Sequence, residues 1–193
     1  MNIGAYTFSQ FNEIAEKFHG YAAPGLLVGG YMVELAKGLL PEETLFEAVV
    51  ETGKCLPDAV QLLTLCSTGN RRLHIRDLGL YAVSLYDKKT GVGVRVSIDP
   101  AKLYAYPEIR GWFMKEKPKQ AQDVEELERE IEQAGHCICK VQRVQIDKEF
   151  LGHGHMGTVS VCSCCGEAYP LEHGSQCLGC QGQAPYTTLD PEA

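Results

Sequence analysis

Two C-x-x-C pairs near the C-terminus constrain the fold of this chain more than any other feature. Cys162 and Cys165 form the first pair, and Cys177 and Cys180 form the second after eleven intervening residues. Each pair places two thiolates on one side of a tight turn, and two such pairs complete a tetrahedral sulfur shell that suits zinc. Because this segment has too few apolar residues to fold unaided, we expect zinc to contribute about 10 kcal/mol or more to its folding.

Other potential ligands lie close to these pairs. Cys164 is surplus to a four-sulfur shell and is left out of the predicted site. His153, His155 and His173 could each replace a cysteine, but the doubled pair makes such a replacement unnecessary. The sequence therefore predicts a structural zinc site of four cysteines that is closed to substrate.

The composition predicts a soluble cytoplasmic protein. Of the 193 residues, 45% are hydrophobic and 22% are charged, which is typical of globular domains. The first residues lack the basic start and apolar run of a signal peptide, and no stretch approaches the roughly eighteen apolar residues of a membrane span. Nine cysteines in a reducing compartment more often bind metal than form disulfides.

The distribution of charge argues against nucleic-acid binding. The net charge is −7 at pH 7, and no Lys or Arg occurs from Glu149 to Ala193. Because phosphate binding depends largely on Lys and Arg, we interpret the zinc module as a protein-contact or fold-stabilising element.

Residues 1–150 are predicted to form an α+β core, and residues 151–193 a zinc-binding domain. Helices are expected from a cap at Thr7 or Ser9 to His19, and over residues 24–37, 57–65, 107–114 and 121–134. Strands are expected over residues 45–51, 80–86, 92–98 and 137–150, with an antiparallel hairpin around Gly91. The pair Gly29-Gly30 lowers helix propensity by about 1 kcal/mol per residue, which the close approach of another backbone would offset. The charged helix over 121–134 is the best candidate for a linker or a dimer contact.

Three motifs before residue 80 contain candidate functional residues. They are F-H-G-Y-A-A-P-G with His19, C-L-P-D-A-V-Q with Cys55 and Asp58, and C-S-T-G-N with Cys66. His19, Cys55 and Cys66 are potential metal ligands, and Asp58 is a potential orienting or acid–base group. The two cysteines would lie about 15 Å apart along an unbroken helix, so a shared site requires a kinked or shorter helix. Alternatively, His19 only complements a helix C-terminus, and the cysteines are ordinary buried residues.

In combination, these motifs and the final C-x-x-C-G-E resemble the family of the E subunit of formylmethanofuran dehydrogenase over most of the chain. The resemblance implies an α+β core of helices and antiparallel sheet, a C-terminal zinc finger of the treble-clef type, and a homodimer. The family is named after a tungsten or molybdenum enzyme that reduces carbon dioxide to a formyl group, and its E subunit is not expected to hold the pterin. The family core usually reads H-G-H-x-C-P-G. Tyr21 and Ala23 stand here where that motif has its second His and its Cys, and neither replaces a soft ligand well.

Three functional hypotheses follow. The first is a metal-binding accessory or interaction subunit of a redox enzyme in anaerobic one-carbon metabolism. The alternative is a small metalloenzyme or ligand-binding protein that uses the cleft around His19, Cys55, Asp58 and Cys66, since a catalytic zinc needs three protein ligands and an open position. A nucleic-acid-binding regulator ranks third, because the basic residues of the core are sparse. The sequence leaves open whether the chain is an enzyme, and it names no substrate.

Overall fold

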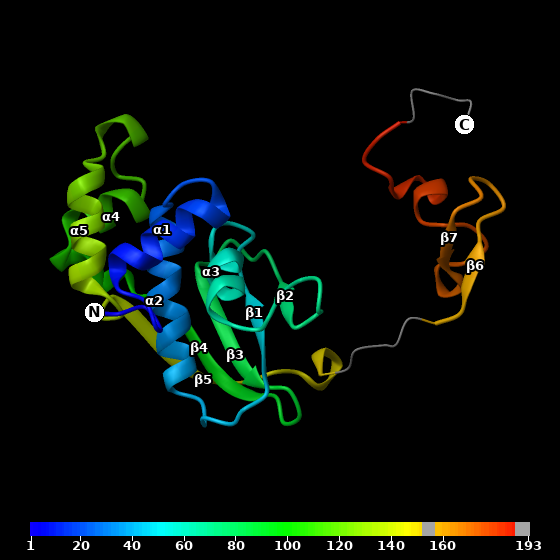
Figure 1. Ribbon diagram of the computed structural model, residues 1–193, viewed down its shortest axis with the longest axis horizontal. Coiled ribbons are helices and arrows are strands. Elements are labelled where there is room, and N and C mark those ends of the chain that lie inside the picture. The colour runs from blue at the N-terminus through cyan, green and yellow to red at the C-terminus, as the bar shows by residue number, and fades with distance from the viewer. Residues whose placement is uncertain (152–156, 188–193) are drawn as a thin grey trace. The chain divides into compact units, whose positions relative to one another are not determined.

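Helices and strands alternate through the first of two compact units into which the chain divides, Met1–Leu151 and Gly152–Ala193. The computed structural model describes residues 1–151 and 157–187 (Figure 1). The first unit contains α1 (Phe8–His19), α2 (Pro24–Gly38), β1 (Phe46–Val50), α3 (Leu56–Leu63), β2 (Leu73–Ile75), β3 (Ala82–Asp87), β4 (Val92–Ile98), α4 (Pro107–Phe113), α5 (Val124–Ala134) and β5 (Cys139–Gln145). The second contains β6 (Val159–Val161) and β7 (Ala168–Pro170). Within the described ranges, no helix combines the length and apolar character that crossing a membrane requires.

The sheet of the first unit has five strands in the order β2-β1-β3-β4-β5. The pairs β1–β3, β3–β4 and β4–β5 are antiparallel, as expected for the predicted α+β class. The predicted hairpin is confirmed, with Gly91 at a φ of 74° in its turn. The strand β2 was not predicted and pairs with β1 in parallel. Its three residues are too few to show an alternating pattern.

The helix α1 begins and ends where its sequence predicts. The Thr7 side chain accepts a hydrogen bond from the Gln10 backbone, and the Gln10 side chain accepts one from the Thr7 backbone, which forms a capping box. The buried residues Phe11 and Ala15 lie on the predicted apolar face. Gly20 closes the helix in the left-handed conformation, so His19 lies at the end of α1, directly before the turn into α2.

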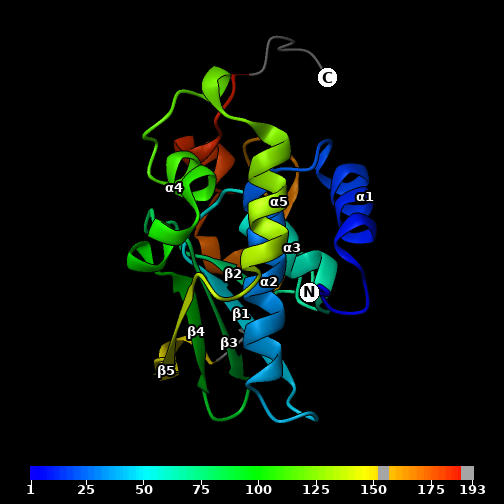
Figure 2. The same ribbon diagram turned by 90° about the vertical axis from the view of Figure 1, so that its left-hand side faces the viewer.

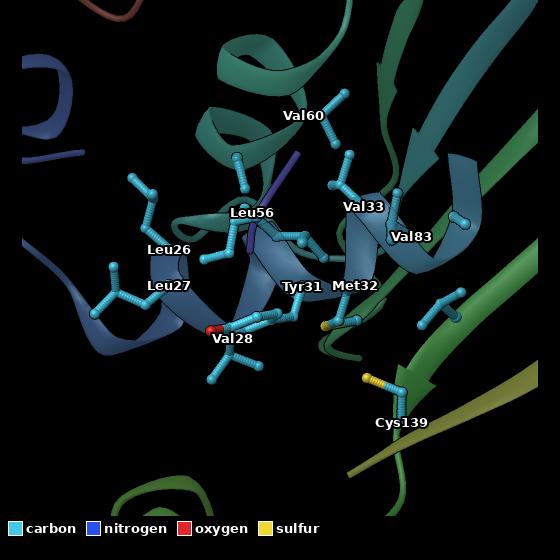
Figure 3. Close-up of a cluster of buried hydrophobic side chains, with 14 of the residues drawn as sticks. Leu26, Leu27, Val28, Tyr31, Met32, Val33, Leu56, Val60, Val83 and Cys139 are labelled. Atoms are coloured by element: carbon cyan, nitrogen blue, oxygen red, sulfur yellow. The ribbon is translucent and has the colours of Figure 1, made fainter. Parts of the chain in front are cut away.

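The helix α2 lies at the centre of the first unit and packs against α1, α3, α5 and the sheet (Figures 1 and 2). Side chains from several of its faces are buried, and Figure 3 shows them beside Leu56 and Val60 of α3 and Val83 of β3. A methyl group on Gly29 would lie 3.0 Å from the Ala59 Cβ atom, and one on Gly30 would lie 2.7 Å from the Phe11 ring. The expected close approach is therefore present, although side chains of α1 and α3 rather than another backbone make it.

The interpretation of the charged helix as a linker is wrong. The corresponding helix α5 lies inside the first unit and packs against α2 and α4 (Figure 2). Leu127 and Ile131 are buried, and the buried Glu130 accepts hydrogen bonds from the backbone N–H groups of Glu108 and Ile109 at 2.9 and 3.0 Å. A carboxylate at a helix N-terminus satisfies free N–H groups, so α5 caps α4 as well as covering the core.

We predict that Gly30→Ala lowers the free energy of unfolding of the first unit by about 1–3 kcal/mol, because the new methyl group overlaps the Phe11 ring. Gly38→Ala is the matched control, since no atom lies within 4 Å of its Cβ position in the same helix. We expect that control to leave stability unchanged or raise it by up to about 1 kcal/mol. Urea unfolding followed by fluorescence of the single tryptophan, Trp112, measures both. Equal effects of the two substitutions would contradict the prediction.

Candidate functional site

The side chains of Cys162, Cys165, Cys177 and Cys180 converge in the second unit. One sulfur atom from each lies within 4.8 Å of all the others. The Cys165 and Cys177 Sγ atoms are 3.7 Å apart. Tetrahedral zinc with Zn–S bonds near 2.3 Å separates its sulfur ligands by about 3.8 Å, so this donor set fits a zinc ion without rearrangement.

Backbone groups of the two turns hold the sulfur atoms in place. The Cys177 N–H donates to the Cys162 Sγ atom, and the Cys180 N–H donates to the Cys177 Sγ atom, each at 3.4 Å. Hydrogen bonds from the backbones of Cys177, Cys165 and Cys164 lower the pKa of the Cys162 thiol to about 6. Such bonds favour the thiolate form, which is the form that binds metal.

The four-cysteine cluster needs a cation to carry more than one thiolate. Hydrogen bonding to Cys177 and Cys165 raises the pKa of the Cys180 thiol well above its usual range, because neighbouring sulfur atoms compete for the same negative charge. A divalent soft metal removes that competition. Among the described residues of the second unit, Cys162 and Tyr169 are the buried hydrophobic residues. The apolar core is therefore too small to stabilise this fold alone, and metal would supply the rest.

The alternative ligands do not join this cluster in the described part of the chain. Cys164 is exposed and His173 lies on a short 3-10 turn, and neither belongs to the converging group. His153 and His155 lie outside the described residues.

In the first unit, the structure brings together His19, Asp58 and Cys55. The His19 Nδ1 atom lies 2.6 Å from an Asp58 carboxylate oxygen, and its Nε2 atom lies 3.9 Å from the Cys55 Sγ atom. His19 comes from the end of α1, Asp58 from the first turn of α3, and Cys55 from the residue before that helix. A carboxylate on one ring nitrogen orients the other toward the thiol, which is the arrangement that prepares a base-assisted nucleophile.

Cys55 occupies an unusual backbone conformation. Its φ of 51° and ψ of −45° are rare for a residue with a side chain and cost about 1–3 kcal/mol. The conformation fits only because Gly25 lies opposite: a methyl group there would come 3.1 Å from the Cys55 Cβ atom and 2.9 Å from the Tyr81 hydroxyl. The Tyr81 hydroxyl donates a 2.5 Å hydrogen bond to the Gly25 carbonyl.

Burial and charge act in opposite directions on the Cys55 thiol. Burial raises its pKa, and the nearby Asp58 carboxylate adds to that rise, while the ammonium groups of Lys54 and Lys115 oppose it. Burial also holds the pKa of Tyr81 well above its ordinary value. Both groups are therefore neutral hydrogen-bond donors near neutral pH.

Cys66 does not take part in this arrangement. It is buried, with 1% of its surface exposed, and its thiol donates to the Phe46 carbonyl at 3.6 Å. Burial raises the pKa of this thiol. The observed helix α3 ends at Leu63, before the predicted Leu65, yet the shorter helix does not place Cys66 beside Cys55 in a ligand group.

The residues of the core do not fit a resident metal ion. In the described ranges, the four-cysteine cluster is the one group of at least three His, Cys, Asp or Glu ligands that converge. The core offers the Cys55 Sγ atom and the His19 Nε2 atom, and the Asp58 carboxylate is engaged on the other side of the ring. Tyr21 packs its ring 5.1 Å from the His19 ring, and Ala23 is buried without a ligand atom in its side chain. A stable site needs at least one more soft donor.

Sequence reasoning missed Gly25 and Tyr81, the residues that hold Cys55 in place. Gly25 follows a proline at a helix start, where glycine carries no clear signal, and Tyr81 lies beyond the predicted motifs. Only the folded chain shows their contact, across 56 residues of sequence.

Comparison with known proteins agrees with this architecture. A family model described as "FmdE, Molybdenum formylmethanofuran dehydrogenase operon" matches residues 18–146, and one described as "FmdE treble clef zinc finger" matches residues 153–187. The chain belongs to the FmdE family. The α+β class and the treble-clef finger predicted from the sequence are thus confirmed.

A solved structure extends the likeness to nearly the full length. It is an FmdE-like protein of the tungsten formylmethanofuran dehydrogenase type from Syntrophus aciditrophicus, with 47% sequence identity and a TM-score of 0.90. The match covers 96% of this chain and 98% of that protein. The resemblance inferred from the motifs is confirmed.

A curated relative comes from Archaeoglobus fulgidus and is described as a "Probable S-adenosyl-L-methionine-binding protein". It is 27% identical over 195 aligned positions, which cover 87% of this chain and 51% of the relative. The chain therefore spans about half the length of this relative.

We predict opposite effects of two substitutions on the reactivity of Cys55. Asp58→Asn removes a charge that raises the pKa of this thiol, so the thiolate fraction and the alkylation rate should rise at a fixed pH below that pKa. Lys115→Gln removes a charge that lowers the pKa, so alkylation should slow. The measurement is the pH profile of iodoacetamide labelling at Cys55, read by peptide mass spectrometry. Slower labelling of Asp58→Asn would show instead that Asp58 acts on the thiol mainly by orienting His19.

Proposed function

We propose that this chain is a metal-binding accessory subunit of a redox enzyme in anaerobic one-carbon metabolism, with one zinc ion held by Cys162, Cys165, Cys177 and Cys180. The convergence of four sulfur atoms in a unit with little apolar core carries the metal-binding part of the proposal. The likeness to FmdE-like proteins supports the link to a formylmethanofuran-type enzyme.

The role proposed for the finger is contact with a partner. From Glu149 to the C-terminus the chain carries acidic residues and no Lys or Arg. A surface of one charge favours a partner surface of the opposite charge and disfavours nucleic acid. We propose such a partner among the subunits of the redox enzyme, with the chain itself as a homodimer. All nine cysteines are free, which supports a reducing, cytoplasmic setting.

The metal content of purified protein tests the zinc site. We expect one zinc per chain in the wild type and none in Cys162→Ser/Cys165→Ser, measured by plasma mass spectrometry. The matched control is Cys164→Ser, which removes an exposed cysteine of the same segment and should keep its zinc. Loss of zinc from the control, or wild-type protein without zinc, would contradict the site. Unchanged Trp112 fluorescence would show that the first unit stays folded in each variant.

Co-purification tests the accessory role. We expect the affinity-tagged chain, expressed in its own host, to elute with bound molybdenum or tungsten from its partner enzyme. The finger variant Cys162→Ser/Cys165→Ser should elute without either metal. Elution of the fully zinc-loaded chain alone, with no molybdenum or tungsten, would refute the accessory role.

A second candidate function is a small ligand-binding protein or metalloenzyme that uses the core site. The hydrogen-bonded pair Asp58–His19 beside the Cys55 thiol favours it. The description of the Archaeoglobus relative supports its ligand-binding form. Two metal ions per chain, one of which survives removal of the finger ligands, would favour the metalloenzyme form.

A further inference from the structure

A cavity of about 590 Å³ opens beside Cys55 in the first unit. Its walls come from the turn between α1 and α2, the chain around and after α4, and the start of α5. Small-molecule sites in proteins usually measure about 300–1,000 Å³, so this cavity has room for an organic ligand.

The charge of this cavity is opposite to that of the whole chain. Lys115, Lys117 and Lys119 line it, and no Asp or Glu does, although the chain carries a net charge of −7. Lys117 pairs with Glu108. In the portion that the structure describes, neither Lys115 nor Lys119 takes part in an ion pair. Cations gathered in a concave, largely apolar site raise the local concentration of anions.

The rest of the wall is suited to a planar ring. Tyr21 and Trp112 both line the cavity, and 56% of the Tyr21 surface is exposed. The Lys115 ammonium group lies 5.5 Å from the centroid of the Trp112 ring. Aromatic rings stack on one another, and a cation beside the stack adds attraction for an anionic substituent.

The backbone also marks this cavity. In the described ranges, Cys55, Arg71 and Lys115 are the residues other than glycine with a positive φ. Two of these three, Cys55 and Lys115, line the cavity. Such conformations persist where the surrounding structure holds them, and they gather at ligand sites.

From these contacts we infer that the cavity binds a small organic anion with a planar ring, its anionic group facing Lys115 and Lys119 and its ring lying against Tyr21 and Trp112. The inference rests on the ligand-binding form of the second candidate function, to which it adds a chemical class. It is independent of the zinc site, because no finger residue lines the cavity.

Ligands that share one ring but differ in charge test the inference on the full zinc-loaded chain. The probes are adenosine 5′-monophosphate as the anion, adenosine as the neutral analogue, and S-adenosyl-L-methionine as the analogue with a cationic sulfonium. Trp112 reports binding by fluorescence because it is the single tryptophan of the chain and lines the cavity. We expect the monophosphate to bind most tightly, and added salt to weaken it more than adenosine.

Matched lysine variants locate the charge effect. Lys115→Gln/Lys119→Gln should weaken monophosphate binding about tenfold and leave adenosine binding nearly unchanged. The control Lys88→Gln/Lys89→Gln changes the net charge equally in the turn between β3 and β4, outside the cavity, and should not alter affinity. An equal loss in the control would show non-specific attraction and overturn the inference.

Protection of Cys55 locates the ligand itself. Saturating monophosphate should slow iodoacetamide labelling of Cys55, which lines the cavity, and leave labelling of the exposed Cys137 unchanged. The inference fails if adenosine or S-adenosyl-L-methionine binds as tightly as the monophosphate. It also fails if neither the monophosphate nor benzyl phosphate binds at millimolar concentration. Zinc content and co-purification are separate readouts, so this failure is distinguishable from failure of the accessory role.

Discussion

The close packing of α2 is the constraint on which the rest of the first unit depends. Gly25, Gly29 and Gly30 leave no room for a side chain where Cys55, Ala59 and Phe11 approach the helix. Because these contacts draw α1 and α3 onto the same helix, the end of α1 meets the start of α3. His19 and Cys55, 36 residues apart in sequence, thereby come within 3.9 Å of each other. A wider separation of the helices would remove the core site and one wall of the cavity beside it.

The two units are stabilised by different physical means. The first unit buries a large set of aliphatic and aromatic side chains, which Figure 3 shows around α2. The second has almost no buried apolar surface in its described part, and its four sulfur atoms converge to a geometry that suits one metal ion. Stability of the second unit should therefore follow metal supply, while stability of the first follows packing.

Tyr21 and Ala23 link the two candidate functions of the core. In the family motif, their positions carry a histidine and a cysteine, and here they carry a phenol ring and a methyl group. Both residues line the lysine-containing cavity, so the surface that lacks metal ligands is also the surface available to an organic ligand. The Cys55 thiol remains beside it, held neutral by burial and oriented toward His19. The loss of soft ligands thus changes what this site can bind while its scaffold is kept.

The sequence by itself determined the features that depend on local patterns. Capping residues and periodicity gave most helices and strands, and the spacing of the two C-x-x-C pairs gave the four-cysteine cluster, since a short turn fixes neighbouring sulfur atoms. Tertiary structure decided what depends on distant segments. The strand β2 exists through its pairing with β1, and α5 proved to be part of the core because Glu130 caps α4. Among four candidate core residues, folding joined His19, Cys55 and Asp58 and left Cys66 apart, because burial and long-range packing, rather than sequence spacing, place each side chain.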